Sequence, residues 1–255
     1  MPTLNFKTFG SGDPIIIMHG LFGMLDNWQT IAKKLSEGYM VYVVDLRDHG
    51  KSEHTTDFNY PLLAQDIAEF LEAEWIHKSY IIGHSMGGKT ALQLVKDYPE
   101  LVEKLIVVDI GIKSYKGGHE TILEALTSVP IDSVKTREDV DKHLFRYISE
   151  PGIRLFLMKN LTRNKEGGYR WKMNLKLLIK HYQEILTGIT FDEVVDIPTL
   201  FIRGGKSNYI QDEDLNEIFI HFEDMKLITI ADAGHWVHAE QPNELLSAIK
   251  SFLAV

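Results

Sequence analysis

The sequence predicts an α/β fold, with a mostly parallel sheet, helices on both faces and a helical cap inserted before the penultimate strand. Two observations indicate it. Short β-rich runs alternate with helical periodicity over the first 110 residues, and the alternation returns near residue 197. Several β-rich runs are apolar almost throughout, as expected for strands that are covered on both faces.

The elements follow one another as strand and then helix along both parts of this pattern. Pro61 stands at a first-turn position of the second expected helix, and Pro99 lies just beyond the third. The expected strands are Leu4–Phe9, Pro14–Met18, Tyr39–Val44, Ser79–Ile82, Lys104–Val108, Thr199–Arg203 and Met225–Ile230. The expected helices are Asn27–Ser36, Leu62–Trp75, Met86–Tyr98, Asp212–Phe222 and Asn243–Leu253.

Residues 112–196 interrupt this rhythm and favour helices at about His119–Ser128, Arg137–Ser149, Ile153–Leu161 and Asn174–Leu186. A turn at Asn164–Gly168 before the short Tyr169–Met173 stretch is typical of a small hairpin arm. We therefore expect a core formed by residues 1–111 and 197–255, with residues 112–196 as a cap over one end of the sheet.

Composition excludes several classes of protein. The 255 residues carry a net charge of −9, which makes nucleic acid an unfavourable partner. The chain has no cysteine, so disulfides, thiolate nucleophiles and thiolate metal sites are ruled out. The longest apolar runs are far below the ~18–20 residues of a membrane span. The N-terminus shows no secretory signal pattern, so we expect a cytoplasmic protein.

The sharpest motif is Gly83-His84-Ser85-Met86-Gly87, between an expected strand and an expected helix. This is the setting of a nucleophile elbow, a strained turn that lifts a serine hydroxyl clear of the sheet and needs small residues on either side. The alternative is a glycine-rich turn that contains an incidental serine. We predict that Ser85 is the nucleophile.

A serine needs an adjacent base, and His235 follows a glycine in the loop after the last expected strand. A carboxylate must then orient the imidazole. Asp109 ends an expected strand and is favoured, while Asp212 is the alternative, because the loop that contains Asn208 offers no earlier acid. A strand-end aspartate can also simply cap a turn.

Stabilising an oxyanion requires two N–H donors. The backbone of Met86, directly after the nucleophile, is expected to supply one, and Leu21 in the glycine-flanked loop after the second strand the other. Phe22 and Trp236, which directly follow Leu21 and His235 in the sequence, are expected to bind substrate.

The segments HGLFG, VDLRDHGKS, GHSMGG and GHWVHAEQP, in this order, resemble the α/β-hydrolase fold family. The likeness is greatest to its small esterase and thioesterase branch with a helical cap. The resemblance implies a triad acid after the strand that ends at Val108, in agreement with Asp109. Relatives usually read D-x-R-G-H-G where this chain has Asp45 to Gly50, so Asp48 departs from the pattern in a loop expected to be structural.

Together these features predict a serine hydrolase that cleaves small to medium acyl esters or thioesters through an acyl-serine. Neither a metal nor a nucleotide cofactor is expected, since no supporting motif is present. The alternatives are a lyase of the same fold, in which the serine–histidine pair abstracts a proton, and a non-catalytic ligand receptor. The sequence does not indicate the oligomeric state.

A basic stretch runs from Arg154 to Lys180, with eight basic residues and Glu166 as the only acid. A solvated helix face is one interpretation. The other is that the stretch attracts a substrate with an anionic leaving group, such as an acyl-CoA thioester.

Overall fold

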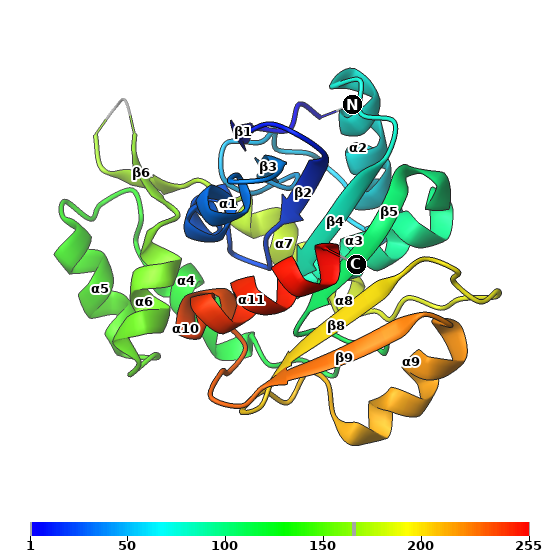
Figure 1. Ribbon diagram of the computed structural model, residues 1–255. Helices are drawn as coiled ribbons and strands as arrows, with labels where there is room; N and C mark the ends of the chain where they lie inside the picture. Colours follow the sequence, from blue (N-terminus) through cyan, green and yellow to red (C-terminus); the bar gives the residue numbers. More distant parts are fainter. Residues whose placement is uncertain (1, 165–166, 255) are drawn as a thin grey trace.

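A seven-stranded sheet in the order β1-β3-β2-β4-β5-β8-β9 forms the centre of the computed structural model, which describes residues 2–164 and 167–254 (Figure 1). Only β1 runs antiparallel to its neighbour β3; the other pairs are parallel. The predicted fold class is therefore confirmed. The strands are β1 (Phe6–Phe9), β2 (Pro14–Met18), β3 (Met40–Val44), β4 (Ser79–His84), β5 (Val102–Val108), β8 (Thr199–Gly204) and β9 (Met225–Ile230).

Helices cover both faces of the sheet because alternate strand residues point to opposite sides. Along β2, Ile15 and Ile17 pack into a core cluster with α1 and α11, while Ile16 and Met18 join a second cluster with α2, α3 and α9. Figure 1 shows α1 and α11 in front of the sheet and α3 behind it. These helices are α1 (Gln29–Leu35), α2 (Tyr60–Ala73), α3 (Met86–Asp97), α9 (Leu215–His221), α10 (Val237–Glu240) and α11 (Pro242–Leu253).

The segment of residues 112–196, here called the inserted segment, connects β5 to β8. It contains α4 (Glu120–Ser128), α5 (Arg137–Phe145), α6 (Pro151–Met158), β6 (Leu161–Arg163), β7 (Tyr169–Trp171), α7 (Leu175–Lys180) and α8 (Tyr182–Ile185). Strands β6 and β7 pair antiparallel, as the hairpin interpretation expects; two residues of the expected turn, 165 and 166, lie outside the described residues. The division into core and cap stays a prediction.

Some expected boundaries are wrong. Leu161 belongs to β6 rather than to the preceding helix, because pairing with Trp171 replaces a further helical turn. The single helix expected at Asn174–Leu186 is broken at His181, which ends α7 and begins α8. The helix expected at Asp212–Phe222 begins instead with a 3-10 turn at Asp212–Asp214. Within residues 2–164 and 167–254, no helix is both long and apolar enough to cross a membrane.

The parallel arrangement positions the site. Strands β2, β4, β5, β8 and β9 all end at the same edge of the sheet, so the loops that follow them meet there. These loops carry Leu21, Ser85, Asp109, Ser207 and His235, respectively.

Candidate active site

Ser85 occupies a tight turn between β4 and α3, with a backbone φ of 53° that a non-glycine residue rarely adopts. Its neighbours must be small. A Cβ on Gly83 would lie 2.2 Å from the carbonyl oxygen of Gly87, and one on Gly87 would lie 2.5 Å from that of Met18. The turn thus has the close backbone approaches that the Gly-x-Ser-x-Gly pattern predicts.

Three predicted residues form a continuous chain of hydrogen bonds. The Nδ1–H of His235 donates to Oδ2 of Asp109 at 2.7 Å, because a carboxylate only accepts. With that proton on Nδ1, the other ring nitrogen, Nε2, faces the hydroxyl of Ser85 at 3.0 Å from Oγ. This arrangement matches that of a serine nucleophile, a general base and an orienting acid.

The carboxylate of Asp109 is fully buried and firmly held. Its Oδ1 accepts a bond from the N–H of Gly204 at 2.8 Å, and its Oδ2 accepts a second from the hydroxyl of Ser207. Asp212, the alternative acid, is mostly exposed and pairs with Arg203 instead. The structure therefore places Asp109, and not Asp212, against the imidazole.

The loop after β2 brings Leu21 beside the nucleophile. A bond of 2.9 Å from Gly23 N–H to the carbonyl of Gly20 closes a turn, and a Cβ on Gly20 would lie 3.1 Å from Cβ of Ser85. Met86 is the first residue of α3, so its N–H lacks an intrahelical acceptor. Both expected donors thus belong to segments that adjoin Ser85.

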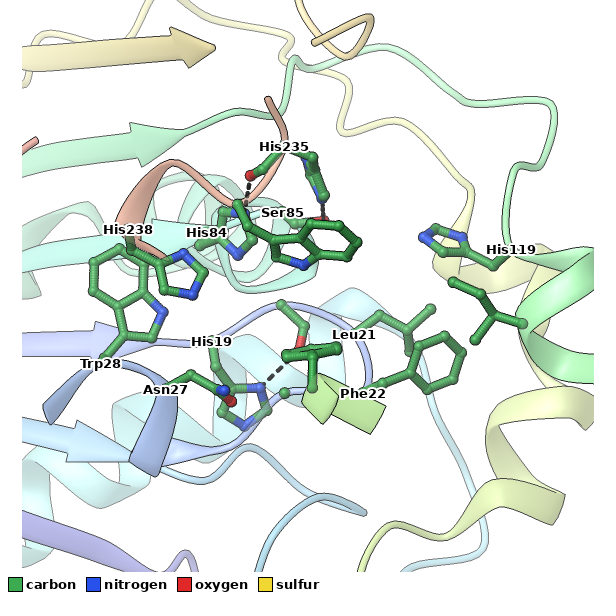
Figure 2. Close-up of a pocket in the computed structure, with 15 residues that line it drawn as sticks. His19, Leu21, Phe22, Asn27, Trp28, His84, Ser85, His119, His235 and His238 are labelled. Carbon is green, nitrogen blue, oxygen red and sulfur yellow. Dashed lines mark hydrogen bonds between the residues drawn. The ribbon is translucent and has the colours of Figure 1, made fainter. Parts of the chain in front are cut away.

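Two cavities meet at Ser85, and Leu21 and His119 also line both of them. The first, called the His235-side cavity, is drawn in Figure 2. The second, called the Met86-side cavity, is lined mainly by apolar and tyrosine side chains: Leu21, Tyr60, Met86, Ile110, Tyr115, Ile185, Leu186 and Tyr209. Phe22 and Trp236, expected to bind substrate, both line the His235-side cavity, where Trp236 packs against Phe156 of α6.

Sequence reasoning missed three residues that support the site. Ser207 binds Asp109, and Tyr209 stacks on the ring of His235 with centroids 3.9 Å apart. His119, from the inserted segment, lies 3.3 Å from the Tyr209 hydroxyl and edge-on to Phe22. Their position in loops near the site was the only signal, because nothing in the sequence shows that these loops meet.

Several histidines around the site are held neutral by burial. Burial lowers the pKa of His19 and of His119 to about 4 and that of His238 to about 3. The pKa of His84 is also well below its usual value, mainly because of burial, and its Nε2–H donates to the carbonyl of His235. His235 therefore lies among uncharged imidazoles.

Lys89 fastens both ends of the inserted segment to α3. Its buried ammonium donates to the carbonyl oxygens of Ile112 and Lys113, where the segment begins, and of Thr187, near its end. Burial lowers its pKa to about 7. These bonds keep the inserted segment attached to the helix that starts at the nucleophile.

The basic stretch is less uniform than its sequence suggests. Arg154 is buried and bound to Asp141, whereas Lys159 and Arg163 are exposed; Lys165 and Glu166 lie outside the described residues. The remaining exposed basic residues of the stretch are Arg170, Lys176 and Lys180.

Asp48 adopts φ of 64°, which explains why glycine suits this position in the family pattern. Its buried carboxylate accepts bonds from Thr55 and from the side chain of Asn174, and its carbonyl accepts from Asn174 N–H. Asp48 therefore connects this loop to the start of α7. Its side-chain hydrogen bonds are to Thr55 and Asn174 and do not involve Ser85, His235 or Asp109.

Among the described residues, no group of three or more histidine, aspartate or glutamate side chains is placed to hold a metal ion.

Comparison with known proteins agrees with the fold. A family model for the alpha/beta hydrolase fold matches residues 13–242. Esterase YbfF of Escherichia coli (strain K12) is 34% identical over 244 residues, which are 95% of this chain and 94% of that protein.

The sn-1-specific diacylglycerol lipase ABHD11 of Mus musculus is 37% identical over 248 residues, which cover 94% of this chain and 80% of that protein. The solved structure of a marine microorganism esterase superposes with a TM-score of 0.97 at 42% identity, covering 99% of this chain and all of that one. The chain therefore belongs to the α/β-hydrolase family. Within that family it is a carboxylic ester hydrolase, like the three relatives above, which are named as esterases and a lipase.

Proposed function

We propose that the protein cleaves esters of small to medium acyl chains through an acyl-enzyme on Ser85. The observation that carries the proposal is the continuous chain of bonds from Ser85 through His235 to the buried Asp109. His235 takes the hydroxyl proton as Ser85 attacks the ester carbonyl, and Asp109 stabilises the imidazolium that forms. The backbone N–H groups of Leu21 and Met86 bind the oxyanion.

The leaving group departs with the proton that His235 took from Ser85. Water then enters, His235 removes a proton from it, and the acyl-serine is hydrolysed with return of that proton to Ser85. Thioesters follow the same route with a thiol as leaving group. The name of the mouse relative makes diacylglycerol a further ester to include in a substrate panel.

Hydrolysis of p-nitrophenyl butanoate tests the proposal. We expect Ser85→Ala to lower turnover by about 10⁴-fold or more, while Ser251→Ala, on the exposed surface of α11, retains wild-type turnover. His235→Ala should cause a similar loss, and the double variant should lose little more, since the two groups act as a unit. Turnover in Ser85→Ala above a tenth of wild type would remove Ser85 from the mechanism.

A further inference from the structure

The two cavities at Ser85 are not equivalent, because only one of them is lined by His235. In the mechanism proposed above, on which this inference rests, Nε2 of His235 protonates the oxygen of the departing alcohol. That oxygen must come within hydrogen-bond distance of Nε2. The alcohol therefore extends into the His235-side cavity, and the acyl chain extends into the Met86-side cavity.

Two buried polar atoms, one on each of two side chains that line the His235-side cavity, have no hydrogen-bond partner within residues 2–164 and 167–254. They are Nε1 of Trp28 and Nδ1 of His238. Trp28 is 0% exposed and His238 is 8% exposed, so bulk water cannot compensate for the missing bonds. Leaving such atoms unpaired is unfavourable, and most buried polar groups in proteins have a partner.

The two side chains that carry these atoms lie against each other on one wall of the cavity. The rings of Trp28 and His238 stack with centroids 4.7 Å apart and planes 17° apart. Figure 2 shows the stacked pair at the opposite end of the cavity from His119, with the indole nitrogen on the edge that faces the cavity. His84, which touches both His235 and His238, lies between this wall and the catalytic imidazole.

We propose that Trp28 and His238 form a polar subsite for the leaving group, which selects alcohols that carry a second hydroxyl. That hydroxyl accepts a hydrogen bond from the indole N–H of Trp28. It forms a second hydrogen bond with Nδ1 of His238, as donor or as acceptor according to the tautomer of the ring. The preferred substrates are thus esters of diols or polyols.

A hydroxyl suits this pair better than other groups do. The indole N–H can only donate, so the ligand atom must accept. Burial lowers the pKa of His238 to about 3, so its ring is neutral and Nδ1 either donates or accepts, according to the tautomer. A hydroxyl can do both, whereas an alkyl or fluoroalkyl end leaves both atoms unpaired.

The test uses matched butanoate esters, so that only the end of the alcohol changes. Values of kcat/KM are measured for 2-hydroxyethyl and 2-fluoroethyl butanoate, and for 3-hydroxypropyl and 3-fluoropropyl butanoate, with the rates of alkaline hydrolysis as the correction for intrinsic reactivity. Fluorine is similar in size to the hydroxyl and withdraws electrons, but it is a poor hydrogen-bonding group. We expect a preference of about ten-fold or more for the hydroxyl ester in at least one pair.

Two variants assign the preference to residues. Trp28→Phe removes the N–H, and His238→Phe retains a ring on Trp28 but removes both nitrogens; each should lower the hydroxyl-to-fluoro ratio toward one. Trp75→Phe is the matched control, since Trp75 is 84% exposed and lines neither cavity, and it should keep the wild-type ratio.

The wild-type ratios decide the matter even if a core variant fails to fold. Equal corrected rates in both pairs would mean that neither atom binds a hydroxyl of the leaving group, and would overturn the inference. A preference that survives in folded Trp28→Phe and His238→Phe would overturn it too. Either result leaves the proposed mechanism intact, because that mechanism is tested separately by the activity of Ser85→Ala.

Discussion

Mild acid should destabilise the fold because it contains histidines that are neutral when folded. Burial lowers the pKa of His19 to about 4 and that of His49 and His238 to about 3, against about 6.5 in the unfolded chain. Burial is the largest cause of the lowered pKa of His19. The hydrogen bonds of the ring also fix its neutral form: Nδ1–H donates to the Gly20 carbonyl while Nε2 accepts from the N–H of Leu46, so a second proton, on Nε2, would face an N–H instead of an acceptor.

The sign follows from proton binding. Below about pH 6.5 the unfolded chain takes up protons that the folded protein does not, so stability is full above that pH and falls as pH drops toward the folded values. At about pH 5 each of the three histidines should lower the free energy of unfolding by about 2 kcal/mol relative to its value at about pH 7.5, or by about 6 kcal/mol together. This is a large fraction of the stability of an ordinary domain.

Urea unfolding at the two pH values measures the loss. His238→Phe retains the stacked ring on Trp28 and should reduce the loss by about 2 kcal/mol. His77→Phe is the control: His77 is exposed, its imidazole stays in water on folding, and the loss should match that of wild type. A total loss below about 1 kcal/mol, or no change in His238→Phe, would refute the reasoning.

Three further predictions concern the site and its surroundings. Asp109→Asn should lower turnover by about 10⁴-fold in a folded protein, whereas Asp212→Asn should be nearly silent; the reverse ranking in p-nitrophenyl butanoate assays would move the acid to the later loop. Asp48→Gly should lower the urea-derived free energy of unfolding by about 2 kcal/mol, because the lost carboxylate bonds outweigh the relief of a positive φ; an unchanged midpoint would contradict this. If the basic stretch attracts anionic leaving groups, charge reversal at Lys159 and Arg163 should raise the KM for an acyl-CoA more than the KM for p-nitrophenyl butanoate, and this difference should become smaller at high salt. Equal effects on the two KM values would mean that the basic stretch is a solvated surface without a role in binding.

The sequence was sufficient to predict most of the sheet and the order of its loops. Strand-length apolar runs and helical periodicity are local signals, and the parallel topology brings the ends of such strands together. Ser85, Asp109 and His235 could therefore be placed at one edge from sequence, and the structure brings them within hydrogen-bond distance of one another. Their roles remain predictions.

Contacts between distant segments were beyond that reasoning. The stacking of Tyr209 on His235 and the bond from Ser207 to Asp109 depend on how a loop folds back, and no local pattern encodes this. The break at His181 has the same origin: periodicity continues through it, but tertiary contacts such as the bond from the Tyr60 hydroxyl to the Ile185 carbonyl fix a different path.

The central claim, an acyl-enzyme on Ser85, is tested most directly by acid-quenching the protein during turnover of p-nitrophenyl butanoate and mapping its peptides by mass spectrometry. The proposed mechanism predicts the added mass of one butanoyl group on the peptide that contains Ser85, and its absence from Ser85→Ala. A butanoyl group on another residue that persists in Ser85→Ala, or full turnover in Ser85→Ala, would contradict it. A proton-abstracting lyase would produce neither the adduct nor hydrolysis of this ester.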